Sequence, residues 1–138
     1  MRYSSADRPF IAAAFPPVTS RPTADSLQEL RARLRAFAAE RDWDQFHNPK
    51  NLAMALAGEA GELLEHFQWL TLEQSANLPP DVLAEVELEI ADVLLFLVRL
   101  ADKLGIDPAA AAEKKLALNA RKYPVDKSRG KATKYNKL

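Results

Sequence analysis

Cysteine is absent from this 138-residue sequence, glycine occurs only four times, and neither sign of charge prevails. Without cysteine the protein can form no disulfide and offers no thiol nucleophile, which is typical of a reducing compartment, so we expect a cytoplasmic protein. Basic and acidic residues number 19 each, so the net charge of zero gives no reason to expect a nucleic acid polymer as partner. No run approaches the roughly 20 apolar residues of a membrane span, and we expect no membrane partner.

Hydrophobic residues make up 48% of the sequence, which is enough for the core of one domain. Residues 1–24 hold four of the nine prolines and show no periodicity, so they predict an extended N-terminal arm. Residues 25–125 predict one helical domain, and the basic residues 126–138 predict a C-terminal tail. The expected helices cover about residues 25–41, 48–70, 81–105 and 107–123. No strand pattern or phosphate-binding glycine loop occurs, so the sequence predicts an all-α, four-helix bundle.

Two of the expected helices each carry a pair of acids three residues apart in apolar surroundings. Glu59 and Glu62 lie in GEAGELLEHFQWL, and Glu89 and Asp92 lie in ELEIADVLLFLVRL. Residues at i and i+3 share a helix face, so two packed helices would direct four carboxylates to one point. A buried, unpaired carboxylate is costly to keep ionised, whereas a hard divalent cation turns the repulsion into coordination. The sequence therefore predicts an acidic metal site inside a helical bundle.

The position of Glu59 is the strongest part of this prediction, because Glu59 interrupts an aliphatic stripe and should point inward. The stripe consists of Leu52, Leu56, Leu63 and Leu70. Glu62 falls on the border of the stripe, and it is our candidate for the catalytic general base, although a ligand role is equally open. Acids spaced three apart are common on solvated helix faces, so one pair alone would indicate little. Two pairs with few basic neighbours favour the metal site.

Other classes of helical protein were weighed against this interpretation. A helical adaptor that only dimerises needs no inward acid, so Glu59 argues against it. A di-iron carboxylate bundle needs Glu-x-x-His pairs, and neither His47 nor His66 has a glutamate three residues before it. The expected helix 81–105 is apolar on several sides, which indicates a central position in the bundle or burial against another subunit.

The C-terminal part of the chain is basic. From Lys114 onward it holds nine of the nineteen basic residues against one acid, Asp126. A divalent metal on one side and cations on the other would suit a polyphosphate. Most of these side chains are expected to be solvated. Lys115 and Asn119 are the better candidates for a substrate contact, because they lie one turn apart on an expected helix.

A family resemblance is carried by the runs ERDWDQFHNPKNLAMALAGEAGELLEHFQWL, ELEIADVLLFLV and KKLALNARKYPVDKSRGKATKY. They resemble the all-α nucleoside triphosphate pyrophosphatases of the MazG superfamily, most of all its dCTP pyrophosphatase branch, over about residues 26–135. The resemblance implies Mg²⁺ as cofactor and a homodimer or homotetramer whose pocket is shaped by more than one chain. It implies four metal ligands, Glu59, Glu62, Glu89 and Asp92. It also implies base recognition by Trp43 and Trp69, and phosphate or sugar contacts from Lys115, Asn119 and Tyr123.

Two departures from the vertebrate dCTP enzymes bear on substrate choice. Those enzymes carry a His where this chain has Leu34, and a Tyr at the substrate-binding position where this chain has Phe96. A missing hydrogen-bond partner weakens discrimination between bases. We therefore expect an enzyme that splits dCTP, or a modified dCTP, into the monophosphate and pyrophosphate with a shallow choice among bases. The alternatives are a broad house-cleaning enzyme for non-standard nucleotides and a non-enzymatic helical oligomerisation module.

Overall fold

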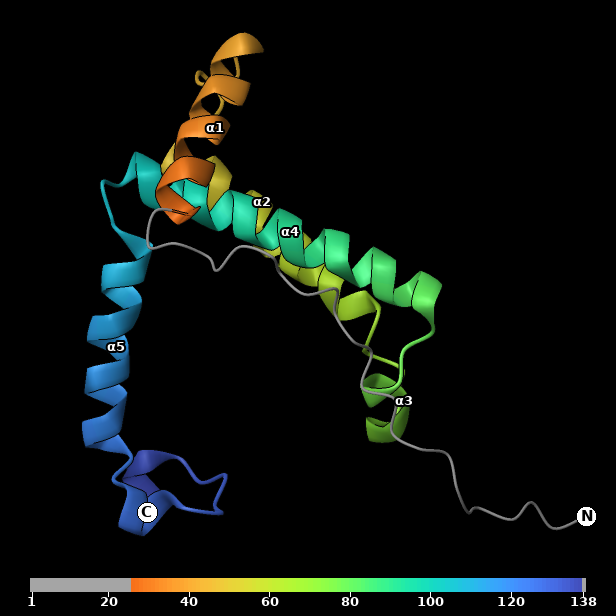
Figure 1. Cartoon of the computed structure of the whole chain (residues 1–138), viewed down its shortest axis with the longest axis vertical. Helices are drawn as coiled ribbons and strands as arrows, with labels where there is room; N and C mark the ends of the chain where they lie inside the picture. Colours follow the sequence, from red (N-terminus) through yellow and green to blue (C-terminus); the bar gives the residue numbers. More distant parts are fainter. Residues whose placement is uncertain (1–25, 138) are drawn as a thin grey trace, which may run out of the picture.

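The computed structural model describes residues 26–137, and over this range it contains helices and turns but no strand (Figure 1). The four long helices are α1 (Ser26–Glu40), α2 (Pro49–Glu65), α4 (Pro80–Lys103) and α5 (Pro108–Lys122). Three short elements join or follow them: α3 (Leu72–Ala76), α6 (Val125–Ser128) and the 3-10 helix η1 (Tyr135–Lys137). The predicted all-α fold with four long helices is confirmed. The predicted arm, residues 1–24, lies outside the described residues.

The starts of α2 and α5 follow from their first residues. The Asn48 side chain accepts a hydrogen bond of 2.9 Å from the Asn51 backbone N–H, and Asp107 accepts one of 3.0 Å from Ala110. Each capping residue is followed by a proline, whose fixed φ suits the first turn and whose missing N–H is not needed there. These two helix starts agree with the sequence-based prediction.

The predicted end of the second helix was wrong. α2 ends at Glu65 and not near Leu70, because the Leu64 carbonyl accepts hydrogen bonds of 3.0 Å from the N–H groups of both Phe67 and Gln68. The chain then turns and enters α3, which the sequence analysis missed. A capping box starts α3, in which the side chain of Thr71 and the side chain of Gln74 each bond the other's backbone N–H. The spacing Thr-x-x-Gln in the sequence is typical of a capping box and indicates the start of a helix at this point.

α4 is the helix around which the others are arranged. It packs most extensively against α2, which runs antiparallel to it, and also against α1 (Figure 1). The fully buried apolar side chains come from these three helices: Ala38, Leu52, Val86, Val98 and Ala101. After α4 the chain turns through Gly105, whose φ of +66° is a conformation that glycine adopts without strain. α5 then leads away from the α2–α4 pair.

One face of α4 is apolar and exposed in the single chain. Leu83, Ile90, Leu97 and Leu104 recur every seven residues, and Leu94 lies beside them. Their exposed fractions lie between 40% for Leu94 and 53% for Ile90. The sequence predicted a central position or burial against another subunit; α4 is central to the packing of α1 and α2, yet these two helices leave part of its apolar surface uncovered. Among the described helices, none is both long enough and apolar enough to cross a membrane.

Candidate metal centre

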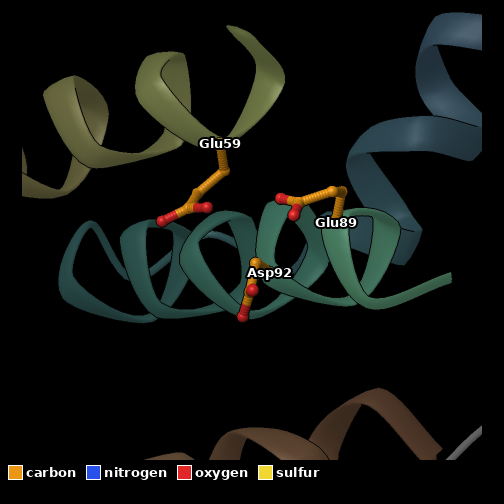
Figure 2. Close-up of side chains that lie close together, drawn as sticks. All are labelled: Glu59, Glu89 and Asp92. Atoms are coloured by element: carbon orange, nitrogen blue, oxygen red, sulfur yellow. The ribbon is translucent and has the colours of Figure 1, made fainter. Parts of the chain in front are cut away.

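Three acidic side chains converge between α2 and α4. Figure 2 shows Glu59 reaching from α2 toward α4, which carries Glu89 and Asp92. One carboxylate oxygen from each residue lies within 4.8 Å of the other two, and all three residues are half-buried. The i, i+3 spacing places Glu89 and Asp92 on one face of α4, and the antiparallel packing brings Glu59 opposite them. The prediction that Glu59 points inward agrees with this placement.

The electrostatics of the trio suit a cation. The Oε2 atom of Glu89 is buried and has no hydrogen-bond partner, a condition that costs free energy unless something binds there. Burial and then the negative charges of Glu62, Asp92 and Glu89 raise the pKa of Glu59. A hard divalent cation with oxygen ligands would remove both penalties. The three carboxylates therefore fit a divalent metal ion.

Glu62 occupies a different place from the other three predicted ligands. It lies one turn after Glu59, is exposed, and is not part of the converging trio. Its charge is nevertheless close enough to contribute to the raised pKa of Glu59. An exposed carboxylate beside the trio can act as a fourth ligand or can accept a proton from a reacting water. Both roles of Glu62 stay predictions.

The two tryptophans lie on either side of α2 in the sequence. Trp43 precedes the helix and is 44% exposed, whereas Trp69 follows it and is 86% exposed. A helix of 17 residues, Pro49–Glu65, is about 25 Å long, because the rise is about 1.5 Å per residue. The single chain therefore places Trp43 and Trp69 near opposite ends of α2, where one base does not span both.

The remaining predicted substrate residues divide between two helices. Phe96 lies on α4, one turn after Asp92, and is half-buried. Lys115, Asn119 and Tyr123 lie on or just after α5, which leads away from the acids (Figure 1). Lys115 is exposed, and the Tyr123 ring packs edge-on against Tyr135 with 6.0 Å between ring centroids. The single chain therefore does not gather these three side chains around the trio.

A cavity of about 450 Å³ opens at the end of α2 that carries Trp69. It is lined by His66, Leu70, Gln74, Asn77, Leu78, Pro79 and Val82. Its wall is mostly apolar with a few polar groups, and its volume is in the range of small-molecule sites. Glu59 and His66 are seven residues apart in sequence, about 10 Å along a regular helix. The His66 wall of the cavity therefore lies about two helical turns from Glu59.

A second charged cluster, which no sequence pattern predicted, lies at the other end of α2. Arg99, Asp102 and Lys103 of α4 bond there to Asp44 and to Arg35 of α1. The i, i+3 spacing of Arg99 and Asp102 was a signal for a local pair. Nothing in the sequence indicated that Asp44 would join them, because it lies 55 residues from Arg99.

Comparisons with known proteins identify the family. The MazG-like family matches residues 55–138. The chain is 44% identical to dCTP pyrophosphatase 1 of Mus musculus, covering 98% of this chain and 75% of that protein. It is 42% identical to dCTP pyrophosphatase 1 of Homo sapiens, covering 85% and 68%. A crystal structure of a pyrophosphatase from Archaeoglobus fulgidus is similar, with a TM-score of 0.65 and 43% identity over 71% of this chain and 92% of that chain. This chain belongs to the MazG-like family.

Proposed function

We propose that the protein is a Mg²⁺-dependent nucleoside triphosphate pyrophosphohydrolase whose preferred substrate is dCTP or a modified dCTP. The observation that carries this proposal is the convergence of Glu59, Glu89 and Asp92 between two helices, with one buried oxygen of Glu89 unpartnered. The proposed substrate is the one in the name of its relatives, dCTP pyrophosphatase 1. Mg²⁺ suits the site because it prefers carboxylate oxygens and binds through few protein ligands together with substrate phosphates.

The proposed reaction replaces one bond at the α-phosphorus. Bound Mg²⁺ would neutralise phosphate oxygens and make water more acidic. Glu62 takes a proton from the attacking water as the water oxygen bonds to the α-phosphorus. The bond from the α-phosphorus to the oxygen that bridges to the β-phosphorus breaks, and pyrophosphate leaves with that oxygen. The products are a nucleoside monophosphate and pyrophosphate.

The base and sugar would occupy the cavity beside Trp69. A triphosphate held at the trio would direct its nucleoside toward the cavity of about 450 Å³, whose residue His66 lies about 10 Å along α2 from Glu59. Trp69 directly precedes Leu70 of the cavity wall, and its exposed ring offers a stacking surface, which is worth about 1 to 3 kcal/mol per base. Phe96 lies one turn after Asp92, whereas Val82 of the cavity lies before it, so Phe96 would contact the substrate from the other side of the trio.

A second copy of the chain would complete the pocket. Trp43 lies near the opposite end of α2 from Trp69, so a base that stacks on both must receive one of them from another subunit. The exposed apolar face of α4 offers the surface for such an assembly, since large apolar patches are rare on monomers. Lys115, Asn119 and Tyr123 on the outlying α5 would then reach the triphosphate of a neighbour. We infer a homodimer or homotetramer.

Broad house-cleaning activity is the second candidate, and it has its own observation. Leu34 and Phe96 are apolar side chains that offer no hydrogen bond to a base edge, and both are half-buried. Pockets that lack such partners discriminate weakly between bases. Because the proposed substrates are cellular nucleotides, a cytoplasmic location is part of this proposal.

Release of pyrophosphate from a nucleotide panel with Mg²⁺ tests the function. We expect equal amounts of monophosphate and pyrophosphate, with the highest kcat/KM for dCTP or a 5-substituted dCTP. Comparable kcat/KM values for non-standard purine nucleotides would favour the house-cleaning enzyme. Release of single phosphates would contradict attack at the α-phosphorus. The absence of any hydrolysis across the panel would leave only a helical oligomerisation module.

A further inference from the structure

Arg99 is the only polar residue that is fully buried in the described part of the chain, with 5% of its surface exposed. Its guanidinium binds three side chains. The Nε atom donates to Nδ1 of His47 over 3.2 Å, one terminal nitrogen donates to Asp102 over 3.0 Å, and the other donates to Asp44. Two of these partners, Asp44 and His47, belong to the segment between α1 and α2. Arg99 therefore ties that segment to α4.

Trp43 sits in this segment, directly before Asp44. Its backbone N–H donates to the Ala38 carbonyl over 2.9 Å, and its ring lies between Phe37, at 5.8 Å, and His47, at 6.2 Å between ring centroids. Both ring contacts are angled rather than stacked, at 73° and 59°. The ring is 44% exposed. The neighbouring residues thus hold the Trp43 ring in place, while part of the ring stays exposed to solvent.

The segment needs such a restraint because its backbone is not regular. Asp42 has a φ of +52°, which a residue with a side chain adopts at some cost in free energy. The Gln45 side chain donates to the Asp42 carboxylate and carbonyl, over 2.8 and 3.0 Å, which stabilises the turn locally. These local contacts do not reach α4. Arg99 and Lys103 make the side-chain hydrogen bonds that do.

The acidic partners of Arg99 do not depend on it alone. Arg35 donates to Asp102 over 2.8 Å, and Lys103 donates to Asp44 over 2.8 Å. These contacts, with the nearby positive charges, hold the pKa values of both carboxyls below their usual range. Removal of the Arg99 head group would therefore leave neither acid without a cation. A buried ion pair is in any case weak evidence for a role in stability alone.

We propose that Arg99 is a positioning residue that fixes the segment 42–47 so that the Trp43 ring is preorganised for nucleobase stacking. The inference rests on the proposed function, in which Trp43 stacks on the base. A loop that is ordered before binding loses less conformational freedom when the nucleotide arrives, so the gain appears as affinity. Arg99 lies two turns of α4 from Asp92 and bonds none of the acids of the trio, so its effect should fall on KM rather than on kcat.

Three variants test the proposal: Arg99→Met, Arg99→Lys and, as the matched control, Arg35→Met. Arg35 bonds Asp102 of the same cluster but no residue of the segment 42–47. The position of Trp43 is read without nucleotide, by acrylamide quenching of fluorescence in a Trp69→Phe background that leaves Trp43 as the single tryptophan. Affinity and turnover are read as KM and kcat for dCTP with Trp69 in place.

We expect Arg99→Met to raise the quenching constant of Trp43 about twofold, because loops with fewer contacts open more often. Its KM should rise about tenfold, the low end of what a lost stacking contact costs in binding, with kcat within about twofold. Arg99→Lys should recover part of both changes, because a lysine reaches one partner but not three. Arg35→Met should change neither quenching nor KM.

Two results would overturn the positioning role. One is unchanged quenching of Trp43 in Arg99→Met, and the other is increased quenching with an unchanged KM, which would leave Arg99 with a structural role only. A general loss of stability cannot imitate the expected result, because an equal fall in melting temperature in Arg99→Met and Arg35→Met would not give the two variants different KM values. If the wild type hydrolyses no nucleotide, the proposed function fails and the positioning role fails with it, even where quenching shows that Arg99 holds the segment.

Discussion

A carboxylate oxygen of Glu59 on α2 lies within 4.8 Å of one of Asp92 on α4, although the two residues are far apart in sequence. Two unit negative charges at this separation repel by about 3 to 4 kcal/mol at an effective dielectric constant near 20. Glu89 adds a third carboxylate to the same point. A cation bound among the three acids would offset this repulsion.

Glu59→Gln and Asp92→Asn should each reduce turnover by more than about a thousandfold, since metal-ion catalysis is worth several kcal/mol. An amide has nearly the volume of the carboxylate, so helical content by circular dichroism should not change. Glu87→Gln, an exposed acid on the same helix, is the matched control and should keep wild-type rates. Activity within tenfold of wild type in both site variants would contradict the assignment of Glu59 and Asp92 as metal ligands.

Metal binding should be visible without any substrate. Addition of Mg²⁺ to EDTA-treated protein should raise the melting temperature, because a ligand that binds only the folded state stabilises it by mass action. Saturation at 100 times the Kd corresponds to about 2.7 kcal/mol. In Glu89→Gln, which changes the unpartnered buried oxygen, the increase should be lost. An identical Mg²⁺ shift in wild type and in Glu89→Gln would place the ion elsewhere.

Trp69→Ala should raise KM for every nucleotide by about one to two powers of ten, because stacking is worth about 1 to 3 kcal/mol and does not choose among bases. Leu72→Ala, at a neighbouring residue that is 92% exposed, serves as the control. The variant should keep the same order of substrates, with the highest kcat/KM for dCTP and slightly lower values for other pyrimidine nucleotides. A wild-type kcat/KM ratio above about 10⁴ for dCTP over dTTP would contradict the shallow choice, because such ratios require hydrogen-bond partners.

The exposed face of α4 should hold subunits together. Light scattering at micromolar concentration should show a dimer or a tetramer for the wild type. Leu97→Glu places a charge within the apolar face and should shift the protein toward the monomer, with loss of activity if the pocket is shared. Asp81→Lys, at an exposed position on the opposite side of the same helix, should leave the mass unchanged. A wild type that stays monomeric at that concentration would refute the assembly.

The ionised carboxylate of Asp102 should stabilise the folded state at neutral pH, and this stabilisation should be lost in strong acid. Hydrogen bonding from Arg35, and then the charges of Arg35, Arg99 and Arg31, lower its pKa in the folded state. The unfolded chain, with a carboxyl pKa of about 3.9, binds the proton more readily, so this stabilisation is present above that pH and is lost as the pH falls through the folded-state value. Asp102→Asn should lose up to about 3 kcal/mol at pH 7, since it breaks a buried ion pair.

Urea titrations at fixed protein concentration, from pH 7 into the acid range, would measure this. The difference in unfolding free energy between wild type and Asp102→Asn should narrow as the pH falls, whereas Glu87→Gln should follow the wild type throughout. A difference that stays constant with pH would mean that the ionisation of Asp102 does not stabilise the fold.

Helix periodicity predicted the part of the molecule that depends on local sequence. The starts of α2 and α5 were correct because Asn48-Pro49 and Asp107-Pro108 determine them within a few residues. The inward position of Glu59 followed from its place in an apolar stripe. The end of α2 was misplaced because apolar residues continue through Leu70, and the spacing of a stripe does not reveal where the hydrogen bonds change to those of turns.

Contacts between distant segments were beyond the sequence. No local rule connects Asp44 with Arg99, since the pair forms only once α1 and α4 have packed. The direction of α5 depends on the backbone at Gly105, whose conformation a glycine allows but does not impose. For the same reason the sequence could name Lys115, Asn119 and Tyr123 as substrate residues from a resemblance, but it could not place them in space.

All four acids come from α2 and α4, one antiparallel helical hairpin joined by the short α3, whereas Trp43 precedes α2 and Trp69 lies in the connection between α2 and α3. If the proposed roles hold, the hydrolytic chemistry is encoded in one contiguous piece of chain, and the stacking groups come from segments outside its helices. We expect that substitutions at residues outside these two helices, such as Leu34 on α1, can alter selectivity without moving the proposed metal ligands. Evolution of new substrate preferences in this architecture need not pass through inactive intermediates.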